Sequence, residues 1–117
     1  INKEHFEPII SGMHKVIYEA GGTARLARIK DISICGKTGT VQNPHGKDHS
    51  VFIAFAPKDN PTIAVAVFVE NAGFGGTWAA PIASLVIEKY IKGKIENSKK
   101  ETRVLKANLL INTKNEK

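Results

Sequence analysis

Three strand-like segments close together in the middle of the sequence limit the possible folds more than any other feature. Residues 32–42 are rich in β-branched side chains, and residues 51–56 and 62–69 are almost wholly apolar. The connections between them, residues 43–48 (NPHGKD) and 57–61 (PKDNP), are short and carry turn-forming residues. This spacing predicts three consecutive antiparallel strands. Because strands that are almost wholly apolar are usually covered on both faces, we expect helices on each side of the sheet.

A helix is predicted before the first strand, over residues 4–20. Apolar side chains recur there at steps of three and four, at Phe6, Ile9, Ile10, Met13, Val16, Ile17 and Ala20. Pro8 fits only in a first turn, and Gly21 with Gly22 is a typical stop signal. Residues 24–30 show no clear period and are expected to form a connector.

A second helix is predicted after the strands. A glycine-rich stretch, residues 71–76, is expected to be a flexible link, and Thr77 can cap the helix with Pro81 in its first turn. One face would carry Ile82, Leu85, Val86 and Tyr90, and the helix would end near Gly93. Residues 104–111 could form a further weak helix. The fold class is therefore α+β, a three-stranded antiparallel meander with a helix before it and a helix after it.

Composition and charge exclude several classes of protein. The 117 residues are 42% hydrophobic and carry a net charge of +6, but residues 93–117 hold seven basic against three acidic side chains and so four of those charges. We interpret this segment as a solvated basic tail rather than a nucleic-acid site. No apolar run reaches the roughly 18 residues of a membrane span. The single cysteine, Cys35, excludes an internal disulfide.

One short motif indicates a binding or catalytic function. It is Gly36-Lys37-Thr38-Gly39-Thr40, in the first predicted strand. A phosphate-binding loop also contains Gly-Lys-Thr, but it needs a further glycine five residues earlier, where this chain has Asp31. It also needs a turn from a strand into a helix, whereas here the strand pattern continues. The alternative is the Lys-Thr-Gly strand of the penicillin-recognising serine enzymes.

The sequence around this motif resembles the end of the transpeptidase domain of elongation-type class B penicillin-binding proteins. The resemblance rests on residues 12–24 (GMHKVIYEAGGTA), the motif itself, residues 55–57 (FAP), Glu70 and the final predicted helix. It covers residues 1–92, which we take as the C-terminal part of the transpeptidase domain, with 93–117 as a separate basic tail. It implies the C-terminal part of the penicillin-binding protein and serine β-lactamase-like fold.

The resemblance implies catalytic roles for Lys37 and Thr40 and substrate-binding roles for Lys37, Thr38, Gly39 and Thr40. The family acylates a serine with the D-Ala-D-Ala end of a peptidoglycan stem peptide, which releases the terminal D-Ala, and then passes the acyl group to an amine, which cross-links the cell wall. Lys37 would attract the substrate carboxylate and tune proton transfer, and the hydroxyls of Thr38 and Thr40 would bond that carboxylate. Gly39 would let the ligand approach the backbone, and the N–H of Thr40 would form half of the oxyanion hole.

The motifs that hold the family's nucleophile are not in this sequence. None of the five serines (Ser11, Ser33, Ser50, Ser84, Ser98) is followed by Lys three residues later or by Asn two residues later. We therefore expect the chain to be a fragment that is inactive alone. The resemblance implies a longer enzyme with a single membrane anchor, outside the cytoplasmic membrane, in a cell-wall synthesis complex that governs cell shape. β-Lactams are implied as inhibitors. The parent could also be a β-lactamase, a D,D-carboxypeptidase or a penicillin sensor without turnover.

Several weaker signals are given structural interpretations. His45 and His49 lie four residues apart, but in a predicted loop without an evident third ligand, so we expect neither a metal nor an organic cofactor. Cys35 is interpreted as a small buried packing residue. Trp78, Phe74 and Tyr90 are expected in the core or in helix packing. The strand 62–69 presents a long apolar edge, and we expect the isolated fragment to self-associate through it.

Overall fold

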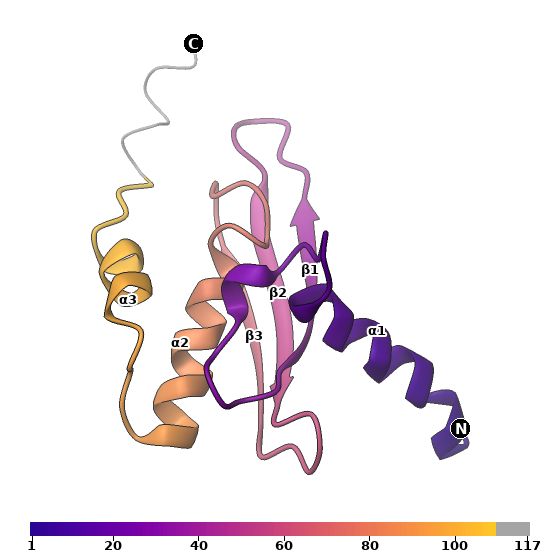
Figure 1. Cartoon of the computed structure of the whole chain (residues 1–117). Helices are drawn as coiled ribbons and strands as arrows, with labels where there is room; N and C mark the ends of the chain where they lie inside the picture. The colour runs from indigo at the N-terminus through magenta and orange to yellow at the C-terminus, as the bar shows by residue number, and fades with distance from the viewer. Residues whose placement is uncertain (110–117) are drawn as a thin grey trace.

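The computed structural model describes residues 1–109 and contains one antiparallel sheet with three helices. The elements in chain order are α1 (Glu7–Tyr18), β1 (Cys35–Val41), β2 (His49–Ala56), β3 (Ile63–Val69), α2 (Ala79–Lys92) and α3 (Ser98–Leu105). The strands are ordered β1-β2-β3, so the predicted α+β meander with a helix before and a helix after it is confirmed. Figure 1 shows α2 alongside the sheet, α1 on the far side of β1, and α3 beside α2.

The first predicted helix forms, but its apolar face is largely exposed. α1 ends at Tyr18, and the turn after it contains Gly21 at a φ of 85°, a conformation that favours glycine. Of the apolar residues on α1 only Ile17 is buried, whereas Ile9 keeps 58% of its surface exposed. The helical period predicted the element correctly, but within the described residues little packs against its apolar stripe.

The sheet has a continuous register around the motif. Lys37 pairs with Ile53 and Thr38 with Phe52 on β2, and Phe52 in turn pairs with Val67 on β3. β1 begins three residues later than the predicted start at residue 32. The cause is a tight turn, in which Ile29 and Ile32 form an isolated bridge and Asp31 takes a φ of 63°.

One face of the sheet, here called the inner face, packs on α2. It consists of the side chains of Ser50, Phe52, Ala54 and Ala56 from β2 and of the partly buried Ile63, Val65, Val67 and Val69 from β3. Because side chains alternate along a strand, this set includes every second residue. Phe52 is the largest fully buried side chain, and it joins the core formed by the small residues of α2 and by Ile17, Ile34 and Ile87.

The predicted details of α2 need two corrections. Val86 and Tyr90 do not lie on the packed face: both are exposed, and the helix turns Ala80, Ala83 and Ile87 toward the sheet. Small alanines allow a close approach of helix and sheet, which a count of large apolar residues cannot anticipate. Thr77 is also not the cap. The helix begins after Trp78 without a side-chain cap, and the amide of Ala79 donates instead to the Ser50 hydroxyl at 3.1 Å.

The opposite, outer face of the sheet is open over β2 and β3. Ile53 and Phe68 on this face are about half exposed, and Lys37 lies among them on β1. α1 contacts β1, and no described helix covers the outer face of β2 and β3. Helices thus lie on each side of the sheet as expected, α1 against β1 and α2 against the inner face, while the outer face of β2 and β3 is uncovered within the described residues.

The last helix lies earlier than expected. α3 spans Ser98–Leu105, whereas the sequence predicted a weak helix over residues 104–111, of which 110 and 111 lie outside the described residues. Its first turn is capped by the Asn97 side chain, which accepts from the amide of Lys100 at 3.0 Å. α3 is polar, so hydrophobic periodicity gives no sign of it, but the Asn cap was a readable signal.

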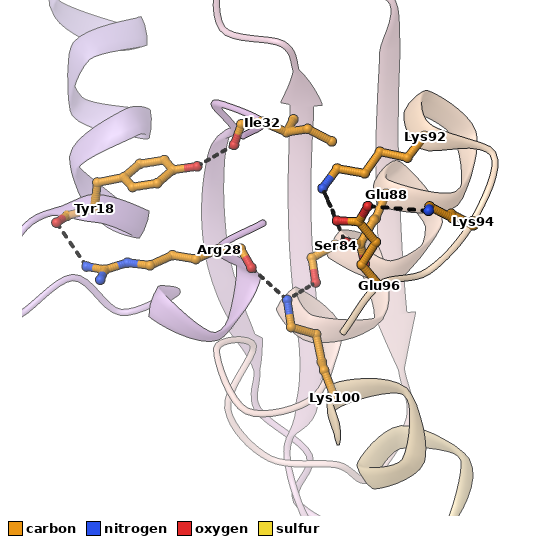
Figure 2. A network of polar contacts seen from close by, with 9 residues as sticks. All are labelled: Tyr18, Arg28, Ile32, Ser84, Glu88, Lys92, Lys94, Glu96 and Lys100. Carbon is orange, nitrogen blue, oxygen red and sulfur yellow. Dashed lines mark hydrogen bonds and ion pairs between the residues drawn. The ribbon is translucent and has the colours of Figure 1, made fainter. Parts of the chain in front are cut away.

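Polar contacts attach α3 to the rest of the molecule (Figure 2). The Lys100 ammonium donates to the carbonyl of Arg28 at 2.8 Å and to the hydroxyl of Ser84 at 2.9 Å. Burial lowers the pKa of this amine, while nearby Glu88 raises it. The Arg28 guanidinium donates to the carbonyls of Ile17 and Tyr18, which connects this contact to the end of α1. α3 is therefore packed rather than simply solvated.

The three aromatic residues assigned to packing have different environments. Phe74 and Tyr90 are 74% and 62% exposed, so the prediction of a core position is wrong for both. Trp78 is partly buried, and the guanidinium carbon of Arg103 lies 4.5 Å from the centre of its ring. Only Trp78 therefore takes part in packing between helices.

The buried position of Phe52 leads to a prediction about stability. Phe52→Ala should lower the free energy of unfolding by about 3–5 kcal/mol, because it leaves a cavity between α2 and the sheet. Urea unfolding followed by circular dichroism measures it. The matched control is Phe68→Ala, since Phe68 is 55% exposed against 0% for Phe52. Equal losses in the two variants would contradict the assignment of the inner face as the core.

Candidate active site strand

The motif residues lie in the middle of β1, at an outer edge of the sheet. β1 pairs with β2 through the whole motif, from Gly36 opposite Ala54 to Thr40 opposite Ser50. In the described part of the chain no strand pairs with the other side of β1. An unpaired strand edge offers backbone N–H and C=O groups to an extended peptide.

Lys37 is exposed on the outer face of β1. Its ammonium donates to the backbone carbonyl of Thr38 at 2.8 Å. Among residues 1–109, no carboxylate lies within ion-pair distance of Lys37. A cation that is held near the backbone but not neutralised by an acid can attract an anionic ligand.

The hydroxyl-bearing residues of the motif alternate with Lys37 across the strand. Thr38 and Thr40 point away from the outer face, because successive side chains of a strand alternate. The Thr38 hydroxyl lies 3.0 Å from that of Thr23, which follows the glycine turn after α1. Thr40 is exposed. The strand thus places the five motif residues within one short stretch, but no contact is seen between the side chain of Lys37 and the two threonine hydroxyls.

Two glycines support β1 from the side opposite Lys37. A Cβ at Gly75 would collide with the carbonyl oxygens of Val51 and Gly39, and a Cβ at Gly76 would collide with the carbonyl of Thr23. We call residues 73–78 the backing loop. The stretch predicted as a flexible link is thus packed tightly on the strand, and its glycines are needed for that close approach.

Side-chain contacts hold the backing loop and its neighbours in place. Ser50 on the inner face donates its hydroxyl to the carbonyl of Phe74 at 3.0 Å. The amide of Gly73 donates to the carbonyl of Asp48 at 2.7 Å, and the amide side chain of Asn43 donates to that of Asn71 at 2.7 Å. The turn after β1 and the loop after β3 are thereby joined beside the motif.

The two histidines near the motif have different surroundings. His49 Nδ1 accepts from the backbone amide of Asn71 at 3.0 Å, while His45 is exposed in the turn. The described residues contain no group of three or more His, Cys, Asp or Glu side chains able to hold a metal ion.

Cys35 precedes the motif and is fully buried. Its thiol points toward the carbonyl of Ile10 on α1, and burial raises its pKa, an effect that nearby Lys58 opposes. A buried thiol with a raised pKa is a weak nucleophile. The interpretation of Cys35 as a packing residue is therefore confirmed.

The sequence reasoning missed three contributors to this site. Thr23 contacts the motif across 15 residues of sequence, Gly75 supports it from behind, and Tyr18 fixes the segment before it. The Tyr18 hydroxyl donates to the carbonyl of Ile32 at 2.7 Å and accepts from the amide of Ile34. A double glycine after a strand was the one signal in the sequence that could have indicated close packing.

Comparison with known proteins places the chain in a family. The family model described as penicillin binding protein transpeptidase domain matches residues 1–88. The chain therefore belongs to the penicillin-binding protein transpeptidase family. This confirms the resemblance that the motif and its surroundings suggested.

Individual relatives agree with this assignment. Peptidoglycan D,D-transpeptidase MrdA of Haemophilus influenzae is 36% identical over 105 residues, which cover 76% of this chain and 16% of the relative. Peptidoglycan D,D-transpeptidase PbpA of Mycobacterium tuberculosis is 38% identical over 97 residues, covering 74% of this chain and 18% of the relative. The chain thus spans less than a fifth of the length of these relatives.

Solved structures show the same arrangement of elements. Pseudomonas aeruginosa PBP2 in complex with WCK 5153 superposes with a TM-score of 0.69 at 36% identity, over 83% of this chain and 22% of that one. Penicillin-binding protein A from M. tuberculosis, as its imipenem acyl-enzyme, gives a TM-score of 0.66 at 32% identity, over 78% and 20%. No helix among the described residues is long and apolar enough to span a membrane.

Proposed function

We propose that this chain supplies the Lys-Thr-Gly wall of the active site in a peptidoglycan D,D-transpeptidase. The observation that carries the proposal is the position of Lys37, an exposed cation without a carboxylate partner among residues 1–109, on a strand with a free edge. Membership of the transpeptidase family and the printed names of the relatives support the same activity.

A role is proposed for each residue of the motif from Lys37 to Thr40. The Lys37 ammonium attracts the carboxylate of a D-Ala-D-Ala stem peptide or of a β-lactam, and assists proton transfer. The Thr38 and Thr40 hydroxyls bond that carboxylate. Gly39 leaves room for the ligand beside the backbone, and the N–H of Thr40 stabilises the negative oxygen of the tetrahedral intermediate.

The nucleophile must come from sequence other than these 117 residues. The family's Ser-x-x-Lys and Ser-x-Asn motifs are absent from the chain, so its five serines are not candidates. We propose a complete enzyme that is anchored by one membrane segment, works outside the cytoplasmic membrane and belongs to a cell-wall synthesis complex. We propose residues 1–92 as the transpeptidase part and residues 93–117 as a basic segment that follows it, whose helix α3 packs on that part through Lys100 and Arg103.

The role of Lys37 predicts the effect of its removal. In the complete transpeptidase, Lys37→Ala should slow acylation by a fluorescent penicillin about 100-fold or more, because a charge-stabilising and proton-transfer group is lost. Stability should change by less than about 0.5 kcal/mol, since the side chain is exposed. Stopped-flow fluorescence measures the acylation rate constant, and thermal denaturation measures the stability.

Lys58→Ala is the matched control, because it removes the same charge from the connection between β2 and β3. Acylation of this variant should stay at the wild-type rate. If Lys37→Ala also acylates at the wild-type rate, the proposed role of β1 is wrong.

We further propose that the 117-residue chain alone pairs with a second copy through residues 62–69. Among the described residues, β3 pairs only with β2, so its other edge has unpaired backbone groups. Seven of these eight side chains are apolar, and none is charged. Open apolar edges without lysine or proline are templates for strand pairing, and a two-fold dimer closes them most simply.

A lysine on this edge should prevent the pairing. We expect sedimentation velocity at micromolar concentration to detect a dimer of the wild-type chain and a monomer of Ala66→Lys, because a charge on an edge strand opposes pairing. The control variant is Thr102→Lys, which adds the same charge at an exposed position of α3. A monomeric wild-type chain would contradict the proposal.

A further inference from the structure

α3 lies close enough to the backing loop to act on the motif strand. It follows α2 and lies outside residues 1–88, which the transpeptidase family model matches. The Arg103 guanidinium donates to the carbonyl of Thr77 at 3.0 Å. It also stacks over the Trp78 ring, with 4.5 Å between the guanidinium carbon and the ring centre. One side chain of α3 thus holds two successive residues at the end of the backing loop.

The backing loop in turn touches the motif. Gly75 packs directly on the backbone of Gly39, and Gly76 packs on Thr23, whose hydroxyl contacts Thr38. The loop is short and partly buried; within it the amide of Thr77 donates to the carbonyl of Phe74, and the amide of Ala80 in α2 donates to the carbonyl of Gly75. Contacts therefore run without a gap from Arg103 through Thr77 and Gly75 to Gly39.

α3 itself is held in place independently of the loop. Lys100 is clamped between the carbonyl of Arg28 and the hydroxyl of Ser84 (Figure 2). At the turn before α3, Lys92 pairs with Glu96 at 2.7 Å and with the buried Glu88 at 3.8 Å. These contacts fix the direction of the helix, so that Arg103 reaches Trp78 from a supported position.

We propose that Arg103 is a positioning residue for the transpeptidase active site, because it holds the backing loop against Gly39 behind the catalytic strand. The proposal rests on the function assigned to β1 above. The N–H of Thr40 adjoins Gly39, so displacement of the loop moves an oxyanion donor. The position of such a donor affects the acylation rate more than ground-state binding of the ligand.

The experiment compares two variants that each remove one positive charge from α3. Arg103→Ala breaks both contacts with the loop, whereas Lys106 is an exposed residue at the end of the helix and Lys106→Ala is the matched control. In the complete transpeptidase, Arg103→Ala should lower the acylation rate constant by roughly 2- to 30-fold. The dissociation constant of the initial penicillin complex should stay within about twofold, and Lys106→Ala should change neither.

Two further measurements separate positioning from a loss of folding. Trp78 is the single tryptophan of the 117-residue chain, so its fluorescence emission reports the contact between its ring and the Arg103 guanidinium. Arg103→Ala should change this emission. Hydrogen exchange in the complete protein should become faster in peptides that cover the backing loop, but not in peptides from β2. Faster exchange in both regions would indicate general destabilisation and overturn the proposal.

The outcomes also separate this proposal from the one on which it rests. If Lys37→Ala slows acylation while Arg103→Ala behaves like Lys106→Ala, the positioning role is wrong and the function of β1 stands. If Lys37→Ala acylates at the wild-type rate, the function proposed for β1 is wrong, and the positioning role that rests on it is wrong as well. An effect of Arg103→Ala confined to the dissociation constant, or unchanged Trp78 emission, also overturns the positioning role.

Discussion

The contact between α2 and the inner face of the sheet is the interaction on which the rest of the structure depends. Phe52 is buried in this contact. The Ser50 hydroxyl accepts from the first amide of α2 and donates to the carbonyl of Phe74. Burial of apolar surface here fixes β2, and β2 fixes β1 through the paired backbone. The motif can therefore stay exposed at the edge, because its position is set by a neighbouring strand that is packed.

The sequence predicted the elements of this fold better than the way in which they pack. The strands were predictable because apolar runs separated by short, turn-rich connections permit few arrangements. The candidate site could be placed on β1 because the five motif residues occur within that strand. The packed face of α2 was not predictable. The helix approaches the sheet through small residues such as Ala83, while the larger Val86 and Tyr90 face solvent.

Contacts between residues far apart in the sequence account for most of what sequence reasoning missed. Gly75 and Gly76 have the composition of a flexible link, yet their lack of side chains allows them to pack on the backbone of β1 and on Thr23. Arg103 belongs to a polar helix whose charges resemble a solvated tail. Only the three-dimensional structure brings its guanidinium to Trp78, across 25 residues of chain. Local patterns carry no information about such partners.

The central claim is that β1 forms the ligand-binding edge of a transpeptidase active site. A crystal structure of the complete protein acylated by a penicillin tests this claim most directly. The account predicts the penicillin carboxylate within hydrogen-bond distance, about 3 Å, of a hydroxyl of Thr38 or Thr40, with Lys37 nearby. The acyl carbonyl oxygen should accept from the N–H of Thr40. An acylated ligand whose carboxylate and carbonyl both lie away from β1 would contradict the account.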